Sequence, residues 1–173
     1  MKKAIKALGM NMGASRGNNM VYELNKEYTH DGDVKYRQSG YHYFNSIRDV
    51  MYMYCLNRSR IFECELNGDK FDHDGIVHCT NKIKLVREIS KEEIKKYIED
   101  NLDELVNDKD YNIRCEVARQ RYGLDILVND KDIDVRKEVA RQGYGLDILV
   151  NDKNEDVRLE ALNQLELRKN KEN

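Results

Sequence analysis

Residues 102–167 repeat one pattern of apolar and polar positions three times, with a period of 22 residues. In each unit apolar residues recur at helical spacing, as at Val135, Val139 and Ala140, and predict an amphipathic helix. The apolar run 146–150 predicts a second helix of only a turn or two, 3₁₀ in character. A fixed period of this kind indicates a solenoid, in which each unit buries its apolar face only against its neighbours.

Polar residues also occupy fixed columns of the repeat. The aspartate and arginine columns are Asp108, Asp130 and Asp152, and Arg114, Arg136 and Arg158. We expect each aspartate to cap a helix, with Asp132 as an alternative to Asp130, and each arginine to bond to a neighbouring unit's aspartate or carbonyls. A ladder of charges for an anionic partner is the less favoured interpretation.

The ends of the repeat units carry their own signals. Gly143 and Gly145 are expected to end the helix before them, because glycine readily adopts a positive φ. In the last unit this corner is replaced by Leu165, Glu166 and Leu167. The final helix is therefore expected to run from about Glu155 to Leu167 or beyond, with a frayed tail from Arg168.

The N-terminal half alternates in short apolar runs that predict strands. The predicted strands are 4–8, 41–44, 60–66, 76–79 and 83–89, and 21–24 is either a strand or an extended arm. Ser46 or Asn45 is a candidate N-cap for a helix over 47–56. Ser90, with Glu93 three residues later, forms a capping box for a helix over 91–101.

These patterns predict an α+β protein with two domains. Residues 1–90 form a small mixed α/β head. Residues 91–173 form a capping helix followed by a short right-handed α-solenoid of three 22-residue repeats, each an α-helix plus a short α or 3₁₀ helix.

Composition narrows the classes of function. The chain has 173 residues, 36% of them charged, and a net charge of −2, which gives no general attraction to nucleic acid or membrane. It has no apolar run of membrane-spanning length and no signal-peptide core, so we expect a cytoplasmic protein with reduced thiols. The candidate metal ligands do not match a zinc spacing, and we expect neither metal nor cofactor; they are His30, His42, His73, His78, Cys64 and Cys79.

Residues 102–167 resemble the leucine-rich repeat variant, a HEAT-like repeat that alternates an α-helix with a 3₁₀ helix. The resemblance rests on residues 127–140, which read Leu-Val-Asn-Asp-Lys-Asp-Ile-Asp-Val-Arg-Lys-Glu-Val-Ala. The chain departs from that repeat after the helix, where residues 142–145, Gln-Gly-Tyr-Gly, stand in place of two proline positions. The resemblance implies a short protein-binding solenoid.

Residues 3–90 resemble a phage- and prophage-associated domain of unknown function. The resemblance rests on Gly40 to Phe44, Asp49-Val50, Tyr52 and Tyr54, Arg60 to Glu65, and Lys82 to Ile89. It implies a mobile-element protein in a bacterial host cell. The expected function is non-enzymatic binding of a host or phage protein, with inhibition of a host defence system as a candidate use. A homodimer is a candidate assembly.

The candidate binding residues are the freer charges and the corner aromatics of the repeat. They are Arg119, Arg121, Tyr122, Lys137, Arg141 and Tyr144. Tyrosine and arginine are enriched at the centres of protein interfaces. A solvated face for the charges, and packing over the corner for the tyrosines, are the alternatives.

The competing hypothesis places an enzyme in the head. The order of its aromatic strand, its tyrosine-bearing helix and Glu63-Cys64-Glu65 is similar to that of ADP-ribosyltransferases, which implies a head pocket. That pocket would be lined by Tyr41, His42, Tyr52 and Glu65. Alternation along the strand instead makes Glu63 and Glu65 surface residues.

Overall fold

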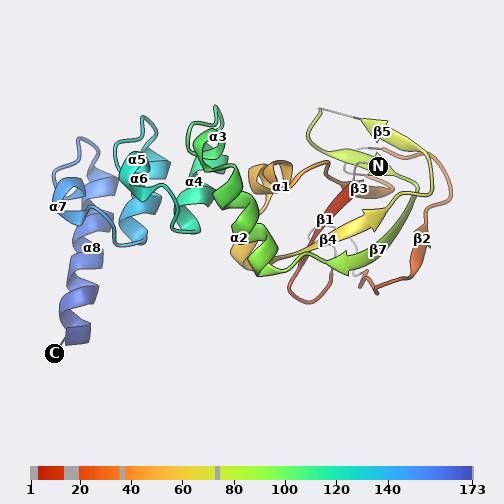
Figure 1. Cartoon of the computed structure of the whole chain (residues 1–173), viewed down its shortest axis with the longest axis horizontal. Coiled ribbons are helices and arrows are strands. Elements are labelled where there is room, and N and C mark those ends of the chain that lie inside the picture. Colours follow the sequence, from red (N-terminus) through yellow and green to blue (C-terminus); the bar gives the residue numbers. More distant parts are fainter. Residues whose placement is uncertain (1–3, 14–19, 36–37, 73–74, 173) are drawn as a thin grey trace. The chain divides into compact units, whose positions relative to one another are not determined.

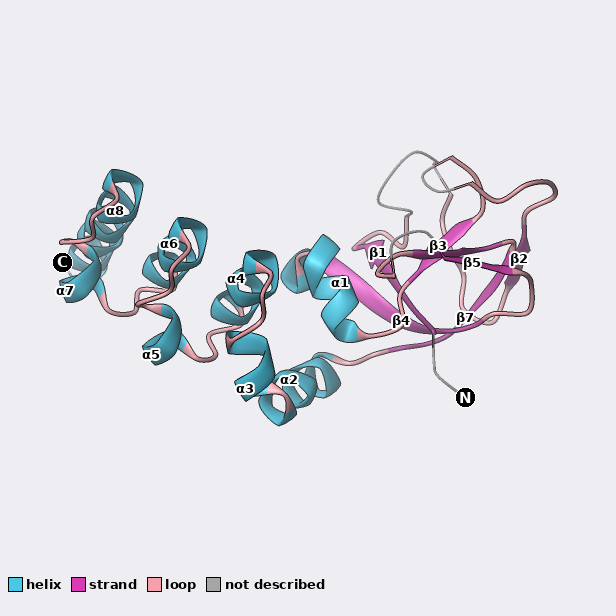
Figure 2. Cartoon of the chain, turned by 90° about the horizontal axis from the view of Figure 1, so that it is seen from above, coloured by secondary structure: helices cyan, strands magenta, loops and turns pink. Residues whose placement is uncertain are grey.

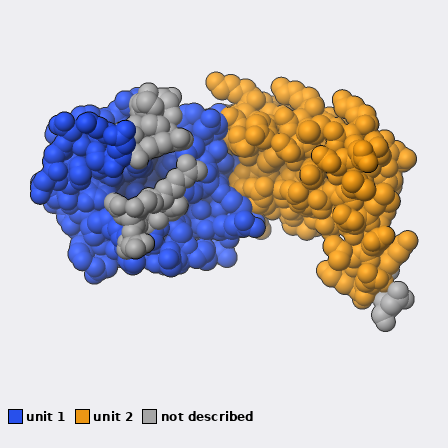
Figure 3. All heavy atoms as spheres, turned by 180° about the vertical axis from the view of Figure 1, so that it is seen from behind, with its two compact units in different colours: residues 1–94 blue, residues 95–173 orange. Residues whose placement is uncertain are grey.

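The computed structural model describes residues 4–13, 20–35, 38–72 and 75–172. It divides into two compact units, residues 1–94 and residues 95–173 (Figure 3). The first unit is rich in antiparallel sheet and the second is helical (Figure 1). The chain therefore mixes strands and helices in the order that the sequence predicts.

The first unit contains two antiparallel sheets. The four-stranded sheet has the order β1 (Ala4–Gly9), β4 (Ser59–Glu65), β7 (Lys82–Glu88) and β2 (Glu27–Thr29). The three-stranded sheet has the order β3 (Tyr41–Tyr43), β6 (His78–Thr80) and β5 (Lys70–Asp72). A bridge between Ile5 and Phe44 joins β1 to the end of β3.

The strands predicted at 4–8, 41–44, 60–66, 76–79 and 83–89 overlap β1, β3, β4, β6 and β7. Two strands, β2 and β5, were not predicted. Each has only three residues and lies at a sheet edge, so each carries one apolar residue, too few to show an alternating pattern. The segment 21–24 makes single bridges, Val21 with Gly13 and Leu24 with Leu85, as an extended arm does.

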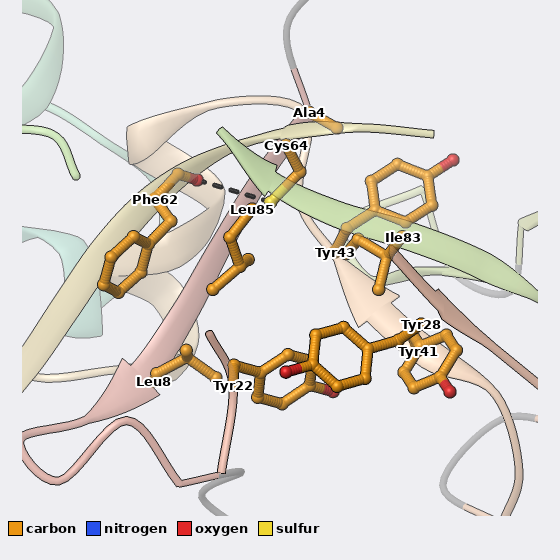
Figure 4. Close-up of a cluster of buried hydrophobic side chains, with 10 residues drawn as sticks. All are labelled: Ala4, Leu8, Tyr22, Tyr28, Tyr41, Tyr43, Phe62, Cys64, Ile83 and Leu85. Carbon is orange, nitrogen blue, oxygen red and sulfur yellow. Dashed lines mark hydrogen bonds between the residues drawn. The ribbon is translucent and has the colours of Figure 1, made fainter. Parts of the chain in front are cut away.

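Tyrosines and aliphatic side chains build the core of the first unit (Figure 4). The cluster comprises Ala4, Leu8, Tyr22, Tyr28, Tyr41, Tyr43, Phe62, Cys64, Ile83 and Leu85. The Tyr22 and Tyr28 rings pack edge to face with centroids 5.0 Å apart, and Tyr41 packs against both. Edge-to-face pairs of this kind add specific geometry to the burial of apolar area.

The first helix, α1 (Ile47–Met53), begins at the predicted cap. The Ser46 hydroxyl accepts a hydrogen bond from the Asp49 backbone N–H at 3.1 Å. The prediction that this helix reaches Leu56 is wrong. Tyr54 adopts an extended backbone and packs its ring edge-on against Phe44, and the 3₁₀ turn η1 (Leu56–Arg58) follows.

The capping box of α2 (Lys91–Asp100) is confirmed. The Glu93 backbone N–H donates to the Ser90 hydroxyl at 3.1 Å, and the Ser90 backbone N–H donates to the Glu93 carboxylate at 2.9 Å. This reciprocal pair satisfies two backbone groups that a helix terminus would otherwise leave without partners.

The rest of the second unit alternates short and long helices. The short ones are α3 (Leu102–Val106), α5 (Leu124–Leu127) and α7 (Leu146–Leu149), and the long ones are α4 (Tyr111–Arg119), α6 (Ile133–Arg141) and α8 (Glu155–Glu172). Figure 2 shows α4, α6 and α8 in one row, with α5 and α7 in a second row beside it. The long helix α4 packs on α6, and α6 packs on α8.

The predicted inner faces of these helices are buried. Val117, Val135, Val139 and Leu127 have no exposed area. The short helices form α-type hydrogen bonds, such as Leu127 N–H to the Gly123 carbonyl at 2.9 Å, so the expected 3₁₀ character is not their main one.

The helix α8 continues to Glu172, so the prediction of a frayed tail from Arg168 is wrong. No glycine or proline interrupts residues 155–172, and leucine, lysine and glutamate favour helix. Arg168 also donates a hydrogen bond to the carbonyl of Gly143. The predicted final helix is therefore confirmed, and it is longer than its shortest expected extent.

The corner within each 22-residue repeat unit, at residues 142–145 for example, requires backbone in the left-handed region. Gly143 has φ +74° and Gly145 has φ +57°, as the sequence predicts for residues that end a helix. In the preceding unit Gly123 matches Gly145, but Arg121 occupies the position of Gly143 with φ +67°. A left-handed conformation costs an L-residue with a Cβ about 1–2 kcal/mol.

The substitution Arg121→Gly is therefore expected to raise the free energy of unfolding by about 0.5–1 kcal/mol, because the relief of strain outweighs glycine's extra unfolded-state entropy. Urea unfolding of the full chain measures the change. The exposed Lys131 lies outside the left-handed region, and Lys131→Gly should lower stability instead. A loss of stability in Arg121→Gly would contradict the assignment of strain.

Candidate functional site

Two of the predicted binding residues, Arg119 and Arg141, form part of a network that joins consecutive 22-residue repeat units of the helical half. Arg119 donates to Glu116 at 2.5 Å in its own helix and to Glu138 at 2.9 Å in the next unit. Arg141 donates to Glu138 at 3.4 Å and to Glu160 at 3.2 Å. The guanidinium groups remain partly exposed, but their first role is to neutralise carboxylates at the packed interface.

The arginine and aspartate columns form a second network. Arg114 makes a two-point ion pair with Asp130, at 2.7 and 2.9 Å, and Arg136 makes the same pair with Asp152, at 2.6 and 2.9 Å. Each arginine also donates to a carbonyl, Arg114 to that of Asp108 at 2.6 Å. The prediction that each arginine of this column bonds to a neighbouring repeat unit is confirmed for Arg114 and Arg136. It is wrong for Arg158, which donates to the Asp152 carbonyl of its own repeat unit.

The prediction that Asp108, Asp130 and Asp152 cap the long helices is wrong. The helices α4, α6 and α8 are capped by Asp110, Asp132 and Asn154, whose side chains accept backbone N–H bonds two residues on. Of the two alternatives, Asp132 is therefore the cap. Asp130 pairs with arginine and accepts the backbone N–H of Asp132, which orders the loop before the helix.

The other four predicted binding residues lie at or near the corners of the repeat. The Tyr122 hydroxyl donates to Glu99 at 2.8 Å, and partial burial together with this carboxylate raises the pKa of Tyr122 to about 12. Tyr144 and Arg121 are exposed and Lys137 is half-buried. Within the described residues these last three side chains make no hydrogen bond or ion pair.

A surface that sequence reasoning missed lies on the short helices. Both α5 and α7 read Leu-Asp-Ile-Leu, and in both the leucines are buried while the central Asp and Ile are exposed. Ile126 is 49% exposed and Ile148 is 51% exposed. We call Asp125, Ile126, Asp147 and Ile148 the short-helix surface. The repeated Leu-Asp-Ile-Leu was the available signal, because a single turn cannot bury all three apolar residues on one side.

The residues of the alternative head pocket are engaged in the fold. Tyr41 packs in the tyrosine cluster, and Tyr52 is half-buried on α1. The His42 carbonyl accepts a hydrogen bond from Lys6, and the Glu65 carboxylate pairs with Lys84 at 3.0 Å. Tyr41, His42 and Glu65 therefore each take part in interactions that hold the fold together.

The most unusual polar group in the head is Lys6, which sequence reasoning also missed. It is 6% exposed, its Nζ donates to the His42 carbonyl at 2.8 Å, and it lies 5.0 Å from the centre of the Tyr22 ring. Burial lowers the pKa of this amine to about 8, although Cys64 and Cys79 oppose the shift. The signal was alternation, since Lys6 shares a strand face with Ala4 and Leu8.

A lysine with a lowered pKa resembles the amines that act as nucleophiles in enzymes. That role needs access to a substrate, and the Lys6 side chain is enclosed by the core of the head. Its amine is therefore best described as a buried base whose charge the fold tolerates, with one carbonyl and one aromatic face as neighbours.

A second polar cluster surrounds His78, which is 7% exposed. Its Nδ1 lies 3.3 Å from the Asp72 carboxylate and its Nε2 lies 2.7 Å from the Asn45 amide nitrogen, while the ring stacks on Tyr43. Both nitrogens have partners, so the histidine is a satisfied structural residue. His73 lies outside the described residues. Across the described residues, no three His, Cys, Asp or Glu side chains gather in a way that suits a metal ion.

Every helix in the described part of the chain is too short or too polar to pass through a lipid bilayer. Neither the curated proteins nor the solved structures include a match to the chain. Residues 2–97 match the family model described as Domain of unknown function (DUF7666), and this segment is more than half of the chain. The chain therefore belongs to the family of this domain of unknown function, DUF7666.

Proposed function

We propose that the chain is a non-enzymatic protein-binding module, in which residues 95–173 act as a short right-handed α-solenoid. Ion pairs between consecutive units, such as Arg136 with Asp152, support the solenoid because they recur at the repeat period. An array of repeats is suited to binding because equivalent residues of successive units form one continuous surface.

The short-helix surface carries this proposal. Ile126 and Ile148 are half exposed at equivalent positions of consecutive units, and each follows an exposed aspartate. Exposed apolar residues in acidic surroundings are suited to a partner with apolar and basic side chains. Tyr144, which is 41% exposed at the neighbouring corner, offers an aromatic anchor of the kind that dominates interfaces.

The biological setting is also part of the proposal. The resemblance of residues 3–90 to a phage- and prophage-associated domain supports a mobile-element protein that acts on a host or phage protein in a bacterial cell. Inhibition of a host defence protein is the use that we favour. The identity of the captured partner tests this use.

A transferase in the head is the competing function. Its candidate carboxylates Glu63 and Glu65 are both held in ion pairs with β7, through Arg87 and Lys84. This pairing explains them as structural residues, and we therefore favour the binding module. A rise in melting temperature of the full chain on adding NAD would instead favour the transferase.

Comparative capture from a bacterial lysate tests the short-helix surface. The tagged full chain, the double variant Ile126→Asp/Ile148→Asp and the control Ile133→Asp are used in parallel, with quantitative mass spectrometry as the readout. Ile133 is 42% exposed but begins α6, so the control introduces the same chemistry outside the surface.

We expect the wild type and Ile133→Asp to capture at least one bacterial protein. The double variant should capture at least about tenfold less of it, which corresponds to a loss of about 1.4 kcal/mol in binding free energy. Thermal melts should show that all three proteins fold. Equal capture by all three proteins, or no specific capture by any, would count against the proposal.

A further inference from the structure

The outer face of α8 is an exposed stacking face. Leu162 aligns with Ala118 and Ala140 of the preceding repeat units, which have no exposed area. These alanines lie on α4 and α6, each of which packs against the next long helix. In α8 this position is 48% exposed, and Leu159, one turn away on the same face, is 51% exposed. The last described unit thus presents leucine where its predecessors bury alanine.

The hydrogen bonds of Arg158 are also incomplete. Arg114 and Arg136 each direct a two-point ion pair at an aspartate 16 residues later, in the next unit. Arg158 keeps the carbonyl bond of its column, to Asp152 at 2.7 Å. Within the described residues it has no carboxylate partner. The same face therefore offers both apolar area and a guanidinium suited to a carboxylate.

We propose that a second copy of this chain covers this face, with the two α8 helices antiparallel and crossing at Leu162. In an antiparallel pair centred on Leu162, each residue before this position faces the residue equally far after it on the other helix. With α-helical spacing, the outward positions one and two turns from Leu162 are Glu155, Arg158, Leu159, Leu165, Glu166 and Lys169.

The charges on this face match in the antiparallel arrangement. Glu155 faces Lys169 of the second copy, and Arg158 faces its Glu166. The remaining pairs are apolar, since Leu159 faces Leu165 of the second copy and Leu162 faces its counterpart across the symmetry axis. A parallel pair would set like charges against each other, because α8 is acidic in its first turn and basic in its last. A symmetric pair also lets one patch serve both chains.

The interface has room to form. The C-terminal part of α8 extends away from the rest of the second unit (Figures 1 and 3). Leu162 and the six outward positions around it, from Glu155 to Lys169, are all at least partly exposed. The site is separate from the short-helix surface, so dimerisation through α8 does not depend on the proposed function.

Sedimentation velocity of the full chain over a range of concentrations tests the proposal. We expect a monomer–dimer equilibrium in the wild type and a monomer at every concentration in Leu162→Asp. Glu155→Lys and Lys169→Glu should each weaken the dimer at least about tenfold, and the double variant should restore it. Ile126→Asp, on the short-helix surface, should leave the equilibrium unchanged.

Oxidative cross-linking tests the register independently. Cysteine introduced as Leu162→Cys should form a covalent dimer under mild oxidation, because this position meets its own counterpart. Leu167→Cys, which is equally exposed in the wild type but lies outside the proposed interface, should cross-link far more slowly. A wild type that stays monomeric at millimolar concentration, or a charge-swapped double variant that fails to recover, would overturn the proposal.

Discussion

Replacing Asp152 with alanine is expected to lower the free energy of unfolding of the helical unit by about 3–5 kcal/mol, since removing one partner leaves the other charge buried and unpaired. The side chains of Arg136 and Asp152 are only 5% and 8% exposed. The aspartate also accepts the Asn154 backbone N–H at 2.8 Å, so the loop before α8 loses a bond as well. Urea unfolding followed by circular dichroism measures the loss.

Two further variants separate the ion pair from simple loss of packing. Arg136→Leu combined with Asp152→Leu should recover most of the lost stability, because no unpaired charge then remains. The exposed neighbour Lys153 provides a matched control, and Lys153→Ala should change stability by less than about 0.5 kcal/mol. A loss as large in Lys153→Ala as in Asp152→Ala would show that the ion pair is not the cause.

The same pair sets a pH dependence. The hydrogen bonds from Arg136 hold the pKa of Asp152 below its ordinary value of 3.8. A depressed carboxyl pKa means that the unfolded chain takes up the proton first. This part of the stability is therefore complete above pH 3.8 and is lost as pH falls through the lower, folded-state pKa. Asp152→Ala should lack this acid-dependent loss.

Replacing Lys6 with methionine is expected to stabilise the head, by about 2 kcal/mol at neutral pH. The folded amine has a pKa of about 8 against an ordinary 10.5, so holding it charged in the core opposes folding. A shift of this size corresponds to about 3 kcal/mol, and the loss of the hydrogen bond to the His42 carbonyl offsets part of it. Thermal and urea unfolding of the full chain measure the gain.

The pH profile identifies the charge as the cause. Because the folded pKa is the lower one, the unfolded chain holds the proton more tightly between pH 8 and 10.5. The free energy of unfolding of the wild type should therefore rise through this window, so that the stability advantage of Lys6→Met shrinks. Lys70→Met, at an exposed lysine of β5, should change stability by less than about 0.5 kcal/mol at every pH. A destabilised Lys6→Met would contradict the account.

The repeat made much of the helical half predictable from sequence. A residue type that recurs in one column of consecutive units has the same neighbours each time, so Arg114 and Arg136 were expected to bond across units, and they do. The positive φ of Gly143 and Gly145 was likewise predictable, because few other residues adopt this conformation without cost. The coarse order of strands followed by helices was also predictable.

Features that depend on three-dimensional neighbours were not predictable. Glu116 and Glu138 resemble solvated helix charges in the sequence, but packing between α4 and α6 buries them and recruits Arg119. The local sequence around Lys6 gives no sign that the Tyr22 ring and the His42 carbonyl, from distant segments, lie against its amine. Strands as short as β5 form only because a neighbouring strand pairs with them.

Amide hydrogen exchange on the full chain tests most directly whether consecutive repeat units of the helical half stabilise one another. Leu149, 1% exposed on α7, is replaced by alanine to create a cavity in the last unit. Because α6 and α8 both contact α7, the account predicts at least about tenfold faster exchange in α6 and α8, with the head strands unchanged. Faster exchange confined to α7 itself would contradict it.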